Sequence, residues 1–204
     1  MPASSPINRL RFCAIDFESA GARPGKTDVP VQLGLARWSI SIGHHDPFVS
    51  YLAADSPVTW AARKVHGIHD SDLTDAPRLQ ELWPTLRSHL HDHVVVAHGM
   101  GTEKRFLRAF PGHRFGPWID TLQLSRAAYP GFPDHSLSAL CDQLGLSAAV
   151  TLAFPDRRWH DALFDAAASL YLLERIIHEF SLDAQPLDAL LHPDLSAWAR
   201  TRRR

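Results

Sequence analysis

Residues 10–18 read LRFCAIDFE, an apolar run that ends in two acidic side chains. The run from Leu10 to Ile15 predicts a buried β-strand, and Asp16 and Glu18 follow it directly. Side chains at i and i+2 of a strand project from the same face, so both carboxylates point the same way. Two like charges on one face repel each other unless a cation lies between them, and Mg²⁺ prefers oxygen ligands. The stretch therefore predicts a sheet edge suited to a divalent cation, with a solvated acidic strand end as the alternative.

Length and composition indicate one globular domain with a buried core. The chain has 204 residues, of which 45% are hydrophobic and 21% are charged. Its 21 Lys and Arg against 22 Asp and Glu give a formal charge of −1, which excludes a wholly basic surface but not a local basic groove. Neither Cys13 nor Cys141 belongs to a CxxC pair, so we expect two reduced thiols and a cytoplasmic location. No apolar stretch approaches the ~20 residues of a membrane span, and the first residues lack the apolar core of a signal peptide.

The hydrophobic pattern predicts an α/β fold in which helices cover a mixed sheet. Strands are expected at 10–15, 31–40, 48–52, 93–99 and 118–120, with the 93–99 strand central and a turn at 44–47. Helices are expected from Ser56-Pro57 onward to Leu90, and at 102–110, 121–129, 135–145 and 161–180. We divide the chain into a flexible N-terminal segment at 1–9, a domain at 10–180, and a C-terminal extension at 181–204 with an arginine-rich end at 200–204.

Acidic side chains recur at two later points where a helix begins. Glu103 lies in the first turn of the helix that follows the 93–99 strand, from where it could reach the same sheet edge as Asp16. The helix dipole favours a first-turn glutamate equally well. His160 precedes Asp165 by five residues at the start of the last long helix, so both can face one cavity. A histidine is a good general base beside a metal-bound water, although a surface residue is the alternative in a chain with 13 histidines.

In combination these residues resemble the DEDD superfamily of 3′–5′ exonucleases, specifically its histidine-bearing (DEDDh) branch. That branch includes the proofreading epsilon subunit of bacterial DNA polymerase III, ribonuclease T and oligoribonuclease. The matching segments run in the family's order over residues 12–175: Ala14 to Glu18, His66-Gly67-Ile68, Ala97-His98 with Phe106-Leu107, Asp120-Thr121-Leu122, and His160 to Ala166. Two positions depart from the family pattern, namely Gly99 in place of asparagine and Thr102-Glu103 in place of Phe-Asp.

The resemblance implies a ribonuclease H-like fold with a five-stranded mixed sheet flanked by helices. It also implies two divalent cations, Mg²⁺ or Mn²⁺, held by Asp16, Glu18, Glu103 and Asp165. His160 would take the proton from the attacking water, which makes all five side chains catalytic. The activity implied is metal-dependent 3′–5′ exonucleolytic hydrolysis of single-stranded nucleic acid, DNA favoured over RNA, with release of nucleoside 5′-monophosphates.

Substrate contacts follow from the same resemblance and from chemistry. The candidates are Phe17, Ser19, His66, His98 and Trp159. The ring of Phe17 points to the opposite strand face from the acids, where core packing is the alternative and only its backbone would meet substrate. Structural roles are the alternative for His66 and His98. Trp159 adjoins His160 and could stack on a base, with core packing again the alternative.

Two other functions fit parts of the sequence. Glu103 and Gly99 also suit a catalytically weakened nuclease-fold module that binds nucleic acid or a polymerase partner. The pairs His66 with His69 and His91 with His93 could contribute to a zinc site, but they lack HExxH spacing and a cysteine partner. Surface histidines are therefore the simpler interpretation of these pairs.

Overall fold

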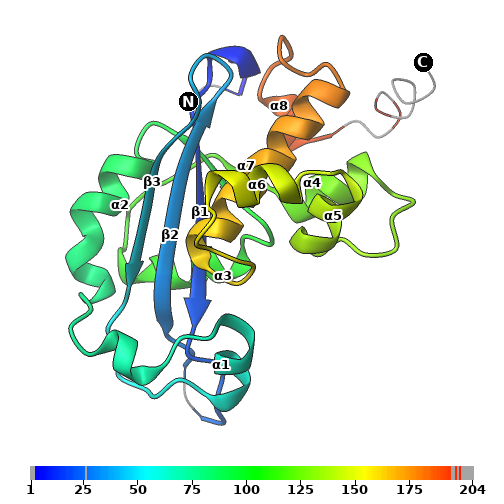
Figure 1. Cartoon of the computed structure of the whole chain (residues 1–204). Helices are drawn as coiled ribbons and strands as arrows, with labels where there is room; N and C mark the ends of the chain where they lie inside the picture. The colour runs from blue at the N-terminus through cyan, green and yellow to red at the C-terminus, as the bar shows by residue number, and fades with distance from the viewer. Residues whose placement is uncertain (1–2, 26, 194–195, 197, 199–204) are drawn as a thin grey trace.

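A five-stranded mixed sheet with strand order β3-β2-β1-β4-β5 forms the centre of the fold (Figure 1). The computed structural model describes residues 3–25, 27–193, 196 and 198. The strands are β1 Phe12–Ser19, β2 Pro30–Ser39, β3 Gly43–Tyr51, β4 Val94–Ala97 and β5 Trp118–Asp120. The first three strands pair antiparallel, whereas β1 with β4 and β4 with β5 pair parallel. The predicted α/β class and mixed five-stranded sheet are thus confirmed.

Helices cover both faces of this sheet. They are α1 Trp60–His66, α2 Trp83–Leu90, α3 Gly101–Phe106, α4 Thr121–Ala128, α5 Leu137–Gln143, α6 Ser147–Ala153, α7 Ala162–Glu179 and α8 Asp188–Leu191. Figure 1 shows α2 on one side of the sheet and α7, with α4, α5 and α6 beside it, on the other. None of the helices described has the length and apolar character that a membrane span requires.

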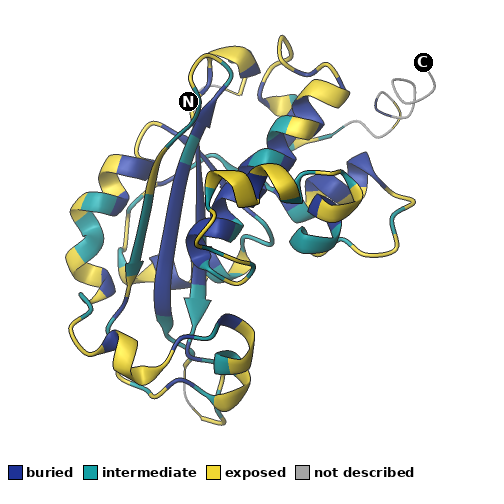
Figure 2. Ribbon diagram, viewed as in Figure 1, coloured by how far each residue is buried: buried dark blue, intermediate teal, exposed yellow. Residues whose placement is uncertain are grey.

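The alternation of side chains along β1 separates two cores and aims the acidic residues. Phe12 and Ala14 pack on the α7 face, whereas Cys13, Ile15 and Phe17 pack on the opposite face. Figure 2 shows β1 and β2 buried along most of their length. Because even-numbered residues of β1 face α7, the continuation of the strand directs two carboxylates, at positions 16 and 18, toward the start of that helix.

A glycine in β2 allows α7 to approach the sheet closely. A Cβ at Gly34 would lie 2.1 Å from the carbonyl carbon of Ala162 and 2.3 Å from the amide nitrogen of Leu163. No real side chain tolerates such distances, so the first turn of α7 rests directly on the β2 backbone. This contact fixes where the helix begins relative to the end of β1.

Several predicted boundaries are wrong. Residues 44–47 do not form a turn but belong to β3, since His44 pairs with Trp38, and the turn lies at 40–42. As an edge strand, β3 accommodates Pro47 without loss of a central ladder bond. The helical stretch expected from Ser56-Pro57 to Leu90 is divided into α1 and α2, with 3₁₀ turns at Asp70–Leu73 and Leu79–Leu82 between them. Helix α1 begins at Trp60, because Thr59 caps it by accepting a hydrogen bond from the amide of Ala62.

Two further expectations about the middle of the chain need correction. The helix expected at 102–110 ends at Phe106 and continues as a 3₁₀ turn, Leu107–Ala109. The 93–99 strand is shorter, Val94–Ala97, although it lies inside the sheet as expected, between β1 and β5. Helices α4, α5 and α7 lie within the predicted ranges and are one, four and two residues shorter, whereas α6 and α8 were not predicted.

The N-terminal segment contacts the segment that follows α7, which differs from the expected flexible residues 1–9. Ile7 is fully buried, and its amide donates to the carbonyl of Gln185 at 2.9 Å. Asn8 donates in the same way to Asp183 at 2.8 Å. Apolar burial and these backbone bonds hold residues 3–9 against the domain. The arginine-rich end at 200–204 lies outside the described residues.

Candidate active site

Four carboxylates from three elements converge where β1 ends. Asp16 and Glu18 come from β1, Glu103 from the first turn of α3, and Asp165 from the first turn of α7. Burial raises the pKa of Asp16 well above its usual range, and the negative charges of Asp165, Glu103 and Glu18 raise it further. The structure therefore brings together all four acidic residues that the sequence motifs singled out.

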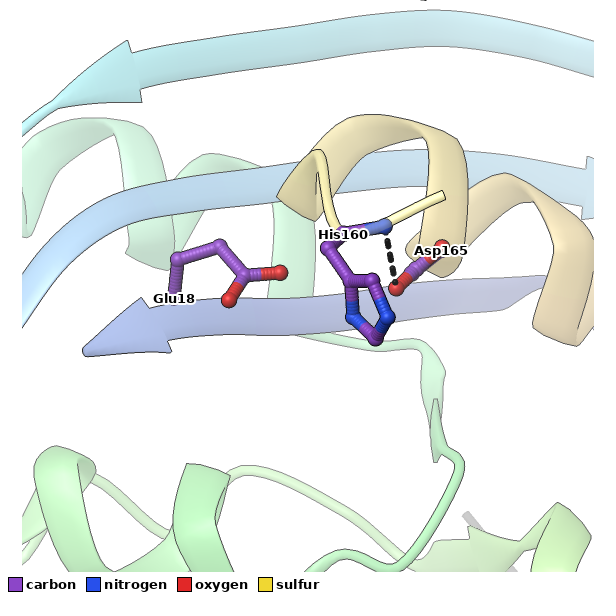
Figure 3. Close-up of side chains that lie close together, drawn as sticks. All are labelled: Glu18, His160 and Asp165. Carbon is purple, nitrogen blue, oxygen red and sulfur yellow. Dashed lines mark hydrogen bonds between the residues drawn. The ribbon is translucent and has the colours of Figure 1, made fainter. Parts of the chain in front are cut away.

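Glu18, His160 and Asp165 form the tightest part of this cluster (Figure 3). One ligand atom from each, a carboxylate oxygen or a ring nitrogen, lies within 4.8 Å of the others. His160 has a left-handed backbone, with φ of 65°, and its amide donates to Asp165 Oδ2 at 3.2 Å. This turn places the exposed imidazole beside the carboxylate of α7.

The acidic cluster fits divalent cations because two of its carboxylates have a buried oxygen without a hydrogen-bond partner among the described residues. Glu103 is 4% exposed, and its Oε2 has no hydrogen-bond partner in the described structure; the same is true of Asp165 Oδ1. Burial raises the pKa of both carboxyl groups to about 7, and burial with the charges of Asp165, Asp161 and Glu103 raises that of Glu18 to about 8. A hard cation with oxygen ligands would satisfy these atoms and remove the mutual repulsion.

Sequence reasoning missed Gln32, which ties β2 to the start of α7. Its side chain is 3% exposed, its Oε1 accepts from the amide of Ala162 at 2.9 Å, and its Nε2 donates to Asp161 Oδ2 at 3.1 Å. Asp161 also caps α7 and accepts from Arg157 at 2.7 Å. The only indication in the sequence was that Gln32 is the one polar residue in the apolar stretch VQLGLA. These bonds hold the turn that carries His160.

His66 lies at the site but uses both ring nitrogens on the backbone. Its Nε2 donates to the carbonyl of Ser19 at 3.1 Å, and its Nδ1 accepts from the amide of Ile68 at 3.0 Å. Burial lowers the pKa of His66, as does the neighbouring His160. A neutral His66 therefore fixes the backbone of Ser19, just beyond Glu18.

His98, for which the sequence predicts a contact with substrate, has both ring nitrogens engaged by groups of the protein. Its ring nitrogens bond Thr121 Oγ1 at 3.0 Å and the carbonyl of His135 at 2.9 Å. Burial lowers the pKa of His98. Asp120 has the structural role that the sequence favoured, because it caps α4 and accepts from the amide of Gly99 at 2.9 Å. These hydrogen bonds give His98 a structural role.

Phe17 and Trp159 differ in how much of each side chain is accessible to substrate. The ring of Phe17 is 6% exposed and packs edge-on against Phe106 with centroids 5.3 Å apart, so only its backbone remains for substrate. Trp159 is half-buried and packs edge-on against Phe164 at 4.9 Å. Part of the Trp159 ring therefore stays accessible beside His160.

The histidine pairs considered for zinc do not gather a ligand set. Within the residues that the structure describes, Glu18, His160 and Asp165 are the group of three or more potential ligands that meets the distance requirement. His66 is engaged as above, and His91 and His93 belong to no such group in that part of the chain. The zinc interpretation therefore receives no support.

Comparison with known proteins agrees with this geometry. A family model described as Exonuclease (RNase_T) matches residues 13–173. A DNA polymerase III subunit epsilon-like protein of Rhodobacter capsulatus is 29% identical over 134 residues, which cover 62% of this chain and 19% of that protein. A PolC-type DNA polymerase III of Bacillus cereus is 28% identical over 139 residues, covering 66% of this chain and 9% of that protein. The chain thus spans less than a fifth of these relatives' length.

Solved structures of nucleases share the fold. Exonuclease X in complex with 5′ overhanging duplex DNA superposes with a TM-score of 0.70 at 23% identity, covering 87% of this chain and 98% of that one. The nuclease domain of 3′hExo, a DEDDh family member bound to rAMP, gives 0.68 at 15% identity, with 86% and 95% covered. The expected ribonuclease H-like fold is confirmed, and the chain belongs to the exonuclease (RNase_T) family.

Proposed function

We propose that the chain is a metal-dependent 3′–5′ exonuclease that removes nucleoside 5′-monophosphates from the 3′ ends of single-stranded nucleic acid, DNA in preference to RNA. The observation that carries this proposal is the convergence of four carboxylates with His160 at one end of β1. A phosphodiester repels an anionic nucleophile, so an acidic cluster of this kind suits its hydrolysis only together with cations.

Asp16, Glu18, Glu103 and Asp165 would hold two divalent ions, Mg²⁺ or Mn²⁺. When bound, the ions would supply an activated water and charge stabilisation for the leaving 3′ oxygen. The unpartnered oxygens of Glu103 and Asp165 support this assignment, because hard oxygen donors suit these ions. Glu103 replaces the family's aspartate with a side chain one methylene longer, yet its carboxylate stays within the electrostatic reach of Asp16.

His160 would act as the general base. Its imidazole is exposed to solvent and lies beside Glu18 and Asp165, where it could accept the proton of the attacking water. The backbone bond from His160 to Asp165 fixes the turn that presents the ring. Asp161 and Gln32 would be positioning residues, since their hydrogen bonds hold that turn.

A cavity of about 430 Å³ beside the site is suited to part of the substrate. His66, Gly67, Arg158 and His160 contribute to its lining. We assign the terminal nucleotide to the surface between this cavity, the backbone of Ser19 and the accessible part of Trp159, where a base could stack. Phe17 would contact substrate through its backbone only. His98 would stabilise the site through its hydrogen bonds to Thr121 and His135.

Digestion of end-labelled substrates tests the proposal. Single-stranded DNA, duplex DNA and short RNA would be incubated with Mg²⁺ or Mn²⁺, and the product ladder would show polarity and sugar preference. We expect shortening from the 3′ end that stops with a chelator and in Asp16→Ala and Asp165→Ala, both judged folded by circular dichroism. Activity that persists in both variants would refute the assignment.

The second candidate is a binding module that serves a polymerase. It is suggested by the polymerase III names of the relatives and by the departures at Gly99 and Glu103. Calorimetry with Mn²⁺ distinguishes the exonuclease from the binding module, since an active enzyme is expected to bind two ions and a degenerate module none. An active chain could also serve a polymerase partner. We place either activity in the cytoplasm, consistent with the buried free thiols of Cys13 and Cys141.

A further inference from the structure

A second, larger cavity lies at the opposite end of the sheet from the carboxylates. It has a volume of about 760 Å³, and Arg11, Arg37, Arg87, His45, His93 and Trp83 contribute to its lining. Arg11 directly precedes β1 and Arg37 pairs with Cys13 near the start of that strand. At ~3.3 Å per residue, the seven steps from Arg11 to Glu18 separate the two sites by about 20 Å. The cavity is therefore distinct from the candidate active site.

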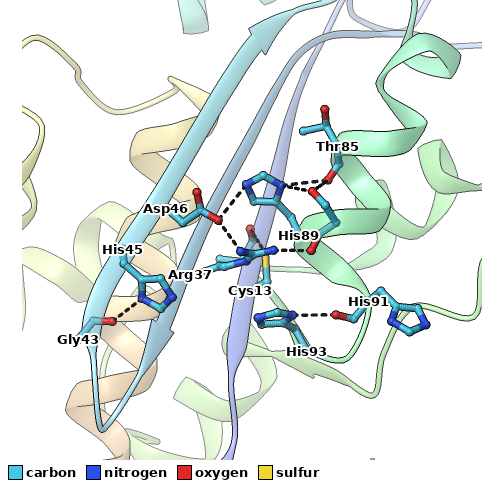
Figure 4. A network of polar contacts seen from close by, with 11 residues as sticks. Cys13, Arg37, Gly43, His45, Asp46, Thr85, His89, His91 and His93 are labelled. Atoms are coloured by element: carbon cyan, nitrogen blue, oxygen red, sulfur yellow. Dashed lines mark hydrogen bonds and ion pairs between the residues drawn. The ribbon is translucent and has the colours of Figure 1, made fainter.

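Arg37 is built into the wall of this cavity (Figure 4). It bridges β3 and α2, because one terminal nitrogen pairs with Asp46 and the other donates to the carbonyl of Ser88. Its buried Nε has no hydrogen-bond partner in the described structure. The fixed guanidinium is thus a permanent positive charge on this wall.

Two further guanidinium groups at the cavity have no acidic neighbour. Arg11 and Arg87 are exposed, and among the described residues no carboxylate lies within 4.0 Å of either. Asp92, which also lines the cavity, pairs with His91 at 3.0 Å. With the histidines neutral, three arginines against Asp92 and the Asp46 that pairs with Arg37 leave a net charge of +1 at the cavity, in a chain whose total charge is −1.

Two histidines of the lining, His45 and His93, are held by backbone hydrogen bonds. His45 Nδ1 bonds the carbonyl of Gly43 at 3.0 Å, and His93 Nδ1 bonds that of His91 at 2.9 Å, which fixes both rings (Figure 4). Burial lowers the pKa of His93, and the charges of Arg37, Arg11 and His45 lower it further. The cavity therefore disfavours another cation and favours an anion.

Apolar side chains also line the cavity. Trp83 is half-buried and stacks on Phe110 with centroids 5.0 Å apart and an interplanar angle of 26°, so its position is fixed. Ile42, which is 66% exposed, and Pro84 belong to the same lining. Arginine forks bind phosphate oxygens in pairs, whereas aromatic rings bind planar bases. The volume lies within the range of small-molecule sites, ~300–1,000 Å³.

We propose that this cavity is a second ligand site, which binds a nucleotide unit through its phosphate on Arg11 and Arg87, beside the fixed charge of Arg37, and through its base on Trp83. The nucleotide is either a free nucleoside monophosphate or part of a nucleic-acid strand, which share this chemistry. The inference does not depend on catalysis, because no group of the acidic cluster takes part. Its failure would leave the proposed exonuclease activity untouched.

The test measures binding by isothermal titration calorimetry on the full chain in the presence of a chelator, so that no hydrolysis occurs. The probes are inorganic phosphate, 5′-AMP and a single-stranded deoxyoligonucleotide. The variant is Arg11→Gln with Arg87→Gln, since Arg37 also has a structural role. The matched control is Arg108→Gln with Arg126→Gln, which removes two exposed guanidinium groups elsewhere.

We expect 5′-AMP or the oligonucleotide to bind more tightly than phosphate, and the Arg11/Arg87 variant to bind that ligand ~10-fold or more weakly. The control pair should keep the affinity of the unaltered chain. If the Arg11/Arg87 variant loses affinity for the oligonucleotide only, the ligand is a nucleic-acid strand. If it loses affinity for 5′-AMP, the ligand is the free nucleotide. The proposal is overturned if neither 5′-AMP nor the oligonucleotide binds, or if inorganic phosphate binds as tightly as these two ligands. It is also overturned if the Arg108/Arg126 control loses as much affinity as the Arg11/Arg87 variant.

Discussion

Gln32 of β2 and Asp161 at the start of α7 are joined by a hydrogen bond of 3.1 Å, although 129 residues separate them in the chain. Through this bond and the one to the amide of Ala162, the sheet holds the turn that carries His160. The geometry of the candidate active site therefore depends on a side chain outside the acidic cluster.

Gln32→Leu removes both bonds and leaves the buried amide of Ala162 without a partner. We expect the free energy of unfolding to fall by about 1–3 kcal/mol, measured by urea denaturation. Because the His160 turn loses its support, kcat should also fall while KM for a short oligonucleotide changes little. Gln80→Leu, at an exposed position, is the control and should alter neither quantity. Unchanged kcat in Gln32→Leu would show that Gln32 is only structural.

Gly34→Ala tests the close approach of α7 to the sheet. The new Cβ would overlap the backbone of Ala162 and Leu163, so the first turn of α7 must move away from β2. We expect destabilisation of about 1–3 kcal/mol and a loss of exonuclease activity, since Asp165 lies on that turn. Gly131→Ala meets no atom within 4 Å and should leave stability and activity near those of the unaltered chain. Normal activity in Gly34→Ala would contradict this role of the contact.

In the absence of metal ions, the free energy of unfolding should decrease as the pH rises. Without cations the folded pKa values of Glu103 and Asp165 are about 7 and that of Glu18 is about 8, all above the ordinary values. The folded state then binds more protons than the unfolded state, so its stability falls as the pH rises through these values. The buried histidines His66, His93 and His98, whose pKa values are lowered, act in the opposite direction below about pH 6.5.

The window that isolates the carboxylates is therefore pH 6.5 to 8.5. In a chelator we expect Tm to decrease across this window, and Mg²⁺ or Mn²⁺ to restore more stability at pH 8.5 than at pH 6.5. Glu18→Gln should flatten the decrease, because its amide does not titrate. A Tm that stays level or rises with pH in the chelator would contradict the raised pKa values.

His160→Ala tests the general base. We expect kcat to fall by ~10²–10⁴-fold with the fold unchanged, because the exposed imidazole contributes no core packing. The pH profile of kcat should lose the limb that reports deprotonation of the base. His178→Ala, at an exposed position on α7, is the control. A small effect on kcat together with an unchanged pH profile would assign the proton transfer to another group.

Local patterns in the sequence were sufficient to predict the class of the fold and most of the acidic cluster. Alternation along FCAIDFES places Asp16 and Glu18 on one face, and helical periodicity from Ala162 onward orients Asp165. These relationships span only a few residues, and backbone geometry alone determines them. The order of the motifs was enough to predict the family.

Tertiary packing decided what short-range periodicity does not encode. The use of both His98 nitrogens by Thr121 and His135, and the bond between Gln32 and Asp161, depend on which helix rests on which strand. The basic cavity likewise exists only because the start of β1, the end of β2 and α2 meet at one end of the sheet. Contacts between distant segments depend on how the whole core packs, so they are absent from any local pattern.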